Sequence, residues 1–373
     1  MRSARAPGPG AAAGRSRKHP MTTVAVDGRG AERGAEALVA GVRAAVADGI
    51  SVRVFGDPTE LAPLDRAGGV ELIAATDQVT NDEEPVAAVR ARDGASIVLA
   101  ARDVAEGRSA ALASAGSTGA TMAAALFALR RMPGVRRPAL AVVLPMPGAS
   151  GSPTLLLDVG ANSEARAQDL VQFAHLGASF SRAVLRVERP RVALLSVGEE
   201  AKKGSAIVID AHEQLTALTR PKGQELDFVG NVEGRDLLAG PADVIVTDGF
   251  TGNVVLKTME GTARAVGAAV REAARSGPRA GLGGLMLRPV LGDLRRRMDP
   301  DTTGGAILLG LRGVAVVAHG SSGPDGIANA IRLAARAVDE KAVERTGELL
   351  ERSGATRAAL RDRKGGNDEP ESR

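Results

Sequence analysis

Asp243-Val-Ile-Val-Thr-Asp248, followed directly by Gly249-Phe-Thr-Gly-Asn253, sets the pattern for the whole chain. A short apolar run predicts a buried strand, and the glycines after it predict a tight turn into the long helix-like sequence that follows. Six other apolar runs begin the same pattern: Thr23–Asp27, Val52–Phe55, Ala110–Ser114, Thr154–Asp158, Val192–Val197 and Val314–Ala318. Strands alternating with helices predict an α/β fold whose mainly parallel sheet is covered on both faces.

The glycine-rich turns are the first candidates for a ligand site. In a parallel sheet the ligand crevice lies beyond the carboxyl ends of the strands, so we expect all these turns to lie at that one edge. A turn that leads into a helix presents free backbone N–H groups and the positive end of the helix dipole, which together bind anions. Three turns have this form, namely Ser114–Gly119, Gly249–Asn253 and Gly320–Gly323.

The composition of the 373-residue chain excludes several classes of protein. It has no Cys, which excludes disulfides, thiol nucleophiles and thiolate metal sites. Aromatic residues make up 2% of the chain, too few for a base-stacking surface. No apolar run approaches the roughly 18 residues of a membrane-spanning helix, so none is expected.

The net charge of +4 comes from the N-terminal segment. Residues 1–20 hold five of the 48 Lys and Arg residues and no acidic residue, which leaves 43 basic and 44 acidic residues in the rest. The rest of the chain is therefore not a basic nucleic-acid-binding surface. The segment lacks the apolar core of a secretory signal, and its Arg, Pro, Gly and Ala content predicts disorder.

These features divide the chain into three parts. Residues 1–20 are expected to form a disordered basic tail, residues 21–345 one α/β domain, and residues 346–373 a polar C-terminal tail that frays.

Within the domain, residues 277–298 interrupt the alternation with a helical apolar segment. Its large apolar residues precede Arg295, Arg296 and Arg297, which suits a partner surface or a membrane interface. A hairpin buried between subunits is the alternative. The contact residues we expect are Leu282, Leu285, Met286 and Leu287.

Single polar residues have competing interpretations. Lys202 or Lys203 could bind a phosphate, or the pair could form a solvated cluster with Glu199 and Glu200. His319, directly after a strand, suits an anion donor or a general acid, but also a structural histidine. Asp158 and Asp248 end strands, where carboxylates commonly hold loop amides.

The glycines of Gly28–Gly34 miss the dinucleotide-binding spacing by one residue, so no nicotinamide cofactor is expected.

Several stretches together resemble the phosphate acyltransferase family, the acyl-carrier-protein:phosphate transacylases of bacterial phospholipid synthesis. They span about Thr23 to Glu340, in the family's order. The stretches are SAGSTGATMAAAL, RRPALAVVLP, LLLDVGAN, LLSVGEEAKKGS, FVGNVEGRDLLAG, ADVIVTDGFTGNVVLKTMEG, GGAILLGLRG and HGSSGPDGIANAI. The resemblance implies a three-layer α/β/α sandwich similar to the phosphotransacetylase and isocitrate dehydrogenase group.

The resemblance also implies site residues. By position, Lys203 and Asn253 match the family's active-site lysine and asparagine. The strand ends and glycine-rich turns would bind phosphate or substrate, through Asp27, Gly116, Ser117, Thr118, Gly119, Asp158, Asn162, Asp248, Gly249, Gly252, His319, Gly320 and Ser321. No metal or cofactor is expected.

The implied reaction moves a long-chain acyl group from acyl carrier protein to inorganic phosphate, giving acyl phosphate for phospholipid synthesis. The implied protein is a cytoplasmic homodimer that contacts the inner face of the membrane, where a glycerol-3-phosphate acyltransferase uses the product. The acidic carrier protein could dock on Arg295–Arg297. The alternatives are a phosphotransacetylase-like enzyme that uses acyl coenzyme A, and an inactive scaffold for lipid enzymes.

The chain departs from the family's pattern in its first loop and in several single residues. The family's DAMGGD reads DGRGAE here, where Arg29, Ala31 and Glu32 replace Met, Gly and Asp, and Ser117 replaces an Asn. Ser196, Ser205 and Thr303 also stand where the family commonly has other residues. An added cation and a lost glycine beside an anion-binding edge predict an altered substrate affinity.

Overall fold

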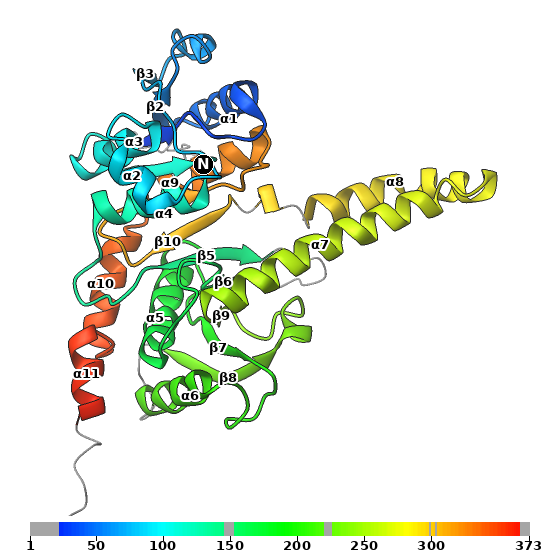
Figure 1. Ribbon diagram of the computed structural model, residues 1–373. Coiled ribbons are helices and arrows are strands. Elements are labelled where there is room, and N and C mark those ends of the chain that lie inside the picture. The colour runs from blue at the N-terminus through cyan, green and yellow to red at the C-terminus, as the bar shows by residue number, and fades with distance from the viewer. Residues whose placement is uncertain (1–21, 145–152, 220–225, 298–299, 303, 366–373) are drawn as a thin grey trace, which may run out of the picture.

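The computed structural model describes residues 22–144, 153–219, 226–297, 300–302 and 304–365. The tail 1–20 lies outside these residues, as do Thr303 and residues 366–373. One large sheet runs through the molecule, and a long pair of helices projects from it (Figure 1).

The described strands form one 11-stranded sheet in the order β3-β2-β1-β4-β11-β10-β5-β6-β9-β7-β8. The strands are β1 (Thr23–Asp27), β2 (Ser51–Gly56), β3 (Val70–Ala74), β4 (Ala111–Ser114), β5 (Ala139–Leu144), β6 (Thr154–Leu157), β7 (Arg191–Ser196), β8 (Asp227–Glu233), β9 (Val244–Val246), β10 (Ala306–Leu309) and β11 (Val314–Val317). All seven apolar runs singled out in the sequence correspond to strands. β3, β5, β8 and β10 were not singled out.

The sheet consists of two parallel blocks that run in opposite directions. β3, β2, β1, β4 and β11 are parallel to one another, and so are β6, β9, β7 and β8. Between the blocks, β10 is antiparallel to both β11 and β5, and β5 is antiparallel to β6. The expectation that all glycine-rich turns lie at one edge is therefore wrong. The turns after β1, β4 and β11 lie at what we call the first edge, and those after β6, β9 and β7 at the opposite, second edge.

Helices cover both faces of this sheet. One face packs against α1 (Gly34–Ala47), α5 (Ala167–Ala183), α6 (Ala206–Leu218), α9 (Pro324–Asp339), α10 (Ala342–Arg352) and α11 (Arg357–Gly365). The other face packs against α2 (Pro85–Ala91), α3 (Ser96–Ala105), α4 (Thr118–Leu129) and the first half of α7 (Gly249–Ala273). The described residues also form three short 3-10 helices, η1 (Ala62–Leu64), η2 (Gly234–Asp236) and η3 (Pro300–Thr302). The three-layer α/β/α architecture is thus confirmed.

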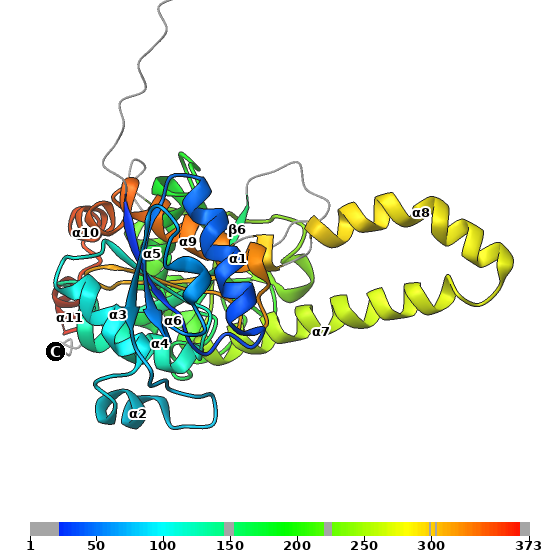
Figure 2. The same cartoon turned by 90° about the horizontal axis from the view of Figure 1, so that it is seen from above.

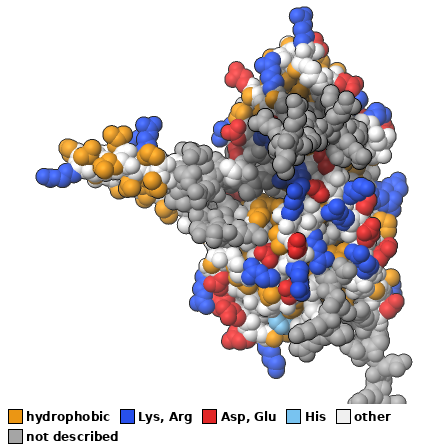
Figure 3. Space-filling view, turned by 180° about the vertical axis from the view of Figure 1, so that it is seen from behind, with side chains coloured by type: hydrophobic (Ala, Val, Ile, Leu, Met, Phe, Trp, Pro, Cys, Tyr) orange, Lys and Arg blue, Asp and Glu red, His pale blue; other side chains and the backbone are white. Residues whose placement is uncertain are grey.

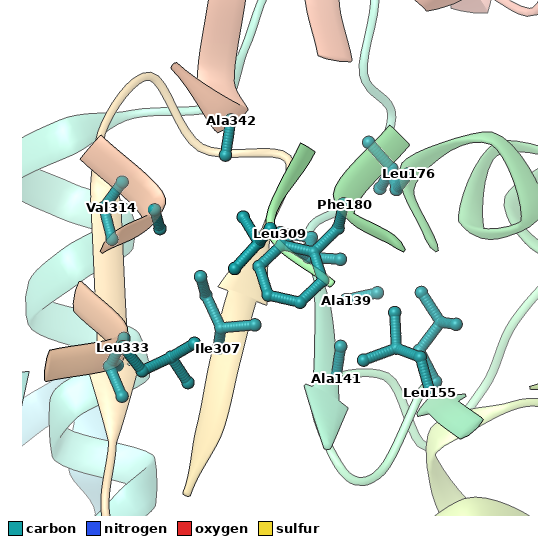
Figure 4. Packing of buried hydrophobic residues seen from close by; sticks show 14 of the residues in the cluster. Ala139, Ala141, Leu155, Leu176, Phe180, Ile307, Leu309, Val314, Leu333 and Ala342 are labelled. Atoms are coloured by element: carbon teal, nitrogen blue, oxygen red, sulfur yellow. The ribbon is translucent and has the colours of Figure 1, made fainter. Parts of the chain in front are cut away.

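The core joins the two blocks at the antiparallel strands. Phe180 of α5 lies against Leu309 of β10, close to Ala139 of β5 (Figure 4). Leu155 of β6 and Leu333 of α9 belong to the same buried cluster. One continuous apolar core therefore spans both blocks.

The C-terminal segment folds further than expected. Helices α10 and α11 continue to residue 365, and Leu349, Leu350 and Leu360 are buried. Gln172 Nε2 donates a hydrogen bond to the carbonyl of Ala355 over 2.9 Å, which fastens this segment to α5. The segment expected to be a polar tail from residue 346 therefore contains most of α10 and all of α11, because regularly spaced apolar residues lie among its charged ones.

A helical arm projects from the domain. The second half of α7 and α8 (Pro278–Arg297) run side by side, away from the sheet (Figures 1 and 2). Leu282, Leu285, Met286 and Leu287 expose 62%, 63%, 74% and 54% of their surface. Apolar side chains gather toward the end of the arm (Figure 3). The side chains of Arg295–Arg297 lie outside the described residues. No helix in the described part of the chain is long and apolar enough to cross a membrane.

Candidate active site

At the second edge, Asp158 holds the turn that follows β6. Its Oδ1 accepts hydrogen bonds from the backbone N–H groups of Leu140, Gly160 and Ala161 over 2.9–3.2 Å. Its Oδ2 accepts from the N–H and the side-chain amide of Asn162 over 2.7 and 2.8 Å. Burial raises the pKa of Asp158, and these hydrogen bonds oppose that rise. The carboxylate therefore fixes the conformation of the loop by accepting hydrogen bonds from its backbone N–H groups.

Helix α7 begins directly on this loop. Asp248 caps it, because its Oδ1 accepts from the N–H of Thr251 over 2.9 Å. Gly249 donates its N–H to the carbonyl of Asn162 over 2.8 Å. At Gly252 a Cβ would lie 1.9 Å from the carbonyl oxygen of Asp158, so only glycine fits here. These contacts fix the first turn of α7 against the β6 turn.

Asn253 and Lys203 lie exposed at this same edge. Asn253 follows Gly252 on α7, and a Cβ at Gly160 would lie 3.9 Å from its Cγ. Lys203 is in the turn after β7, where its carbonyl accepts a hydrogen bond from Ser196 Oγ over 2.9 Å. Because β7 pairs with β9, these two turns leave neighbouring strands. Neither Lys202 nor Lys203 forms an ion pair with another residue that the structure describes.

The first edge is built around Asp27. This buried carboxylate accepts hydrogen bonds from Ser96 Oγ over 2.6 Å and from Ser114 Oγ over 2.8 Å. Burial raises its pKa, and the hydrogen bonds from Ser96, Ser114 and the N–H of Arg29 oppose that rise. Ser96 was not anticipated from the sequence.

The predicted anion-binding turn after β4 lies above Asp27. The Gly116 N–H donates to Ser114 Oγ over 3.0 Å, so it is already engaged. Ser117 caps α4 through a hydrogen bond from the N–H of Ala120 over 3.4 Å. Thr118 is exposed, and Gly119 packs against Pro85. Thr118 is the residue of this turn that is open to solvent.

The altered first loop packs inward. Arg29 exposes 18% of its side chain, donates from Nε to Gln78 Oε1 over 3.3 Å, and pairs with Asp57 over 3.6 Å. Ala31 does not have a positive φ, so the exchange of glycine for alanine there is unstrained. Gly30 has the positive φ, of 85°, and passes close to the backbone of Gly116.

His319 contacts two α7 residues that the sequence analysis missed. Its Nε2 lies 3.1 Å from Lys257 Nζ and 3.6 Å from Glu260 Oε2. Lys257 Nζ also donates to Glu260 Oε2 over 3.0 Å. Partial burial alone would raise the pKa of Glu260, but hydrogen bonds from His319 and Lys257, and their charges, lower it to about 2. Lys257 and Glu260 both lie within the stretch that carries the resemblance, and this signal could have found them.

Helix α7 connects the two edges. It starts beside the turns of the second edge and reaches His319 of the first edge two to three turns later. The other two described histidines pack within the domain. His175 Nδ1 lies 2.9 Å from the carbonyl of Val171, and His212 Nδ1 lies 3.0 Å from Asn231 Oδ1. The candidate site thus extends along α7, between the two parallel blocks.

The fold of the chain is similar to that of the phosphotransacetylases. The EutD phosphotransacetylase from Staphylococcus aureus has this fold, with a TM-score of 0.55 and 17% identity over 85% of this chain and 94% of that one. Residues 22–345 match the family model described as fatty acid synthesis protein.

Two relatives of similar sequence are both phosphate acyltransferases. The phosphate acyltransferase of Thermobifida fusca is 45% identical over 316 residues, covering 83% of this chain and 86% of the relative. That of Heliobacterium modesticaldum is 42% identical, covering 85% and 94%. The chain belongs to the phosphate acyltransferase family. It is an acyltransferase that transfers an acyl group to phosphate.

Proposed function

We propose that this enzyme takes a long-chain fatty acyl group from acyl carrier protein and gives acyl phosphate for phospholipid synthesis. The family assignment supports the acyl transfer to phosphate. The observation that carries the proposal is the exposed pair Lys203 and Asn253, on turns from the neighbouring strands β7 and β9.

The proposed reaction requires no covalent intermediate with the protein. A phosphate oxygen attacks the thioester carbonyl carbon, a C–O bond forms, and the C–S bond then breaks. The sulfur leaves as a thiolate, which takes up a proton. Phosphate is already a nucleophile at neutral pH, so catalysis consists of holding it and stabilising the oxyanion. Lys203 and the turn amides hold phosphate, and Asn253 donates to the phosphate or to the carbonyl oxygen.

Exposed apolar side chains near this pair suit a long acyl chain. Val197, directly after β7, exposes 80% of its surface. Phe250 and Val254, which flank Asn253 on α7, expose 65% and 49%. Extending the pairing of Leu194 with Val246 brings Val197 beside the start of α7. These side chains gain stability when an acyl chain covers them, by roughly 25 cal/mol per Å².

The assay that tests the proposal compares two acyl donors. Purified protein is incubated with inorganic phosphate and either a long-chain acyl-acyl carrier protein or acetyl coenzyme A, and acyl phosphate is trapped with hydroxylamine. We expect kcat/KM to be at least about 100-fold higher for the long-chain donor. Turnover of acetyl coenzyme A alone would favour the short-chain alternative. No turnover of either donor would favour the inactive scaffold.

The remaining partners follow from the same proposal. The enzyme acts as a homodimer and visits the inner face of the membrane, where a glycerol-3-phosphate acyltransferase consumes its product. The exposed apolar face of the arm, Leu282, Leu285, Met286 and Leu287, supports a contact with lipid or with a second subunit.

A further inference from the structure

One face of α7 carries a polar row that begins at Asn253. Lys257 lies four residues further and Glu260 seven, so all three share a face of the helix. Neighbours four residues apart on a helix have Cβ atoms about 5–6 Å apart. Lys257 therefore lies within reach of a ligand held by Asn253.

The ammonium group of Lys257 is held in place, unlike that of an ordinary surface lysine. It contacts Glu260 Oε2 over 3.0 Å and His319 Nε2 over 3.1 Å. His319 is itself fixed from its other nitrogen, since Ser321 Oγ lies 2.8 Å from Nδ1. Lysine has three N–H donors, so the hydrogen bond to Glu260 leaves N–H groups for a ligand.

The positively charged side chain of Lys257 is exposed to solvent, whereas the carboxylate of Glu260 is largely buried. The Glu260 side chain is 9% exposed, whereas the Lys257 side chain is 52% exposed. The low pKa of Glu260, about 2, keeps its carboxylate ionised at neutral pH, so it continues to anchor the lysine. A ligand approaching α7 therefore meets a positive charge whose direction is already set, which lowers the entropic cost of binding.

We propose that Lys257 contacts the phosphate group of the substrate, and that Glu260 and His319 position its ammonium. The inference rests on the proposed function. Lys257 lies between Asn253 at the second edge and the Gly320–Ser321 turn at the first, so it brings the two edges into one site. Lys203 then supplies a second cation, from the β7 turn.

Kinetics of four variants of the full chain test this assignment. Lys257→Ala raises the KM for inorganic phosphate about tenfold or more, because a hydrogen bond to a charged group is lost. Lys257→Arg restores part of the affinity, because it keeps the charge. Glu260→Gln raises the same KM less than Lys257→Ala. The KM for the acyl donor changes little in all of these. Arg264→Ala, an exposed cation seven residues further on α7, is the control and leaves both constants unchanged.

The double variant separates positioning from packing. If Glu260 acts through Lys257, adding Glu260→Gln to Lys257→Ala raises the KM for phosphate no further. An additive loss, or equal losses in Lys257→Ala and Lys257→Arg with a lowered melting temperature, would overturn the proposal. So would a folded Lys257→Ala with an unchanged KM for phosphate.

Binding of inorganic phosphate, measured by calorimetry, keeps this test independent of turnover. A wild-type protein that makes no acyl phosphate contradicts the proposed function. If it binds phosphate and Lys257→Ala binds about tenfold more weakly, the role of Lys257 stands. If wild type and variant bind phosphate equally, or neither binds it, the role of Lys257 is refuted.

Discussion

The carboxylates around the candidate site differ in which groups their oxygens bind. Asp158 and Asp27 are buried and accept hydrogen bonds from the chain itself, so they shape the turns that carry the site. Glu260 is held close to a lysine and keeps its charge. The role of each carboxylate therefore depends on how deeply it is buried and on which groups it hydrogen-bonds, rather than on whether it is Asp or Glu.

The first prediction concerns Asp158. Asp158→Asn puts an amide donor in place of one carboxylate oxygen, and the donors of Asn162 then face another donor. We expect the free energy of unfolding to fall by about 2–4 kcal/mol, measured by urea denaturation followed by circular dichroism. Asp93→Asn, whose side chain is 87% exposed, is the control. Equal stability of the two variants would show that the loop does not depend on this carboxylate.

The second prediction concerns Lys203 and Asn253, the exposed pair proposed for the active site. Lys203→Ala and Asn253→Ala should each lower kcat/KM by roughly 100-fold without unfolding the protein, because in the proposed function each contacts developing charge. Lys202→Ala removes the neighbouring exposed lysine and is the control. Acyl phosphate formation is measured for all three. If both variants fold and form acyl phosphate at rates near that of the wild type, Lys203 and Asn253 do not belong to the active site.

Among the elements, α7 has two tasks along its length. Its first turn is fixed by glycines that allow close backbone contact, its next turns carry the polar row, and its second half leaves the domain as part of the arm. Val266 and Val270 remain exposed on that second half. A helix with exposed apolar side chains on one face suits a further contact surface.

The third prediction concerns the arm. Leu285→Glu combined with Leu287→Glu should abolish flotation with anionic liposomes, because charged side chains replace the apolar ones that lipid would bury. Catalysis in solution and dimerisation, measured by light scattering, should be retained. Val86→Glu, at an exposed apolar site on α2, is the control and should float like the wild type. Loss of the dimer in the arm variant would instead identify the arm as a subunit interface.

The first loop shows how an element absorbs substitutions. Arg29, the added cation, is engaged by Asp57 and Gln78, and Ala31 occupies a conformation that any residue tolerates. The loop is therefore accommodated by the fold. An altered affinity for phosphate or the acyl donor stays a prediction.

For the whole molecule, the antiparallel seam decides how the two blocks behave. β10 and β5 hydrogen-bond to strands on both sides, and one apolar cluster contains residues of both blocks. Neither block can therefore unfold without exposing the core of the other.

The fourth prediction follows from this shared core. We expect the domain to unfold in a single cooperative transition, although its size exceeds that of many two-state proteins. Because the chain has no Trp and no Tyr, far-ultraviolet circular dichroism and hydrogen exchange are the suitable probes. Strands β1 and β7, from different blocks, should lose protection at the same urea concentration. Separate midpoints would show that the blocks are independent domains.

The sequence by itself determined the architecture and the chemistry-bearing turns. The apolar runs, such as Asp243–Asp248, and the helices between them follow from local periodicity, which depends on near neighbours alone. The long match across the chain supplied the family, together with Lys203 and Asn253 as the pair to test.

Only the tertiary structure decided which turns share an edge. β5 and β10 were not singled out, and a strand's direction in the sheet depends on its hydrogen-bonded partners, which local sequence does not encode. The mainly parallel sheet therefore reverses direction at β10 and β5, and its turns lie at two edges where one was expected. The contact of Lys257 and Glu260 with His319, some sixty residues away, arises because α7 crosses from one edge to the other. Tertiary packing sets which distant residues a side chain contacts, and here it makes α7 the connection between the two edges of the candidate site.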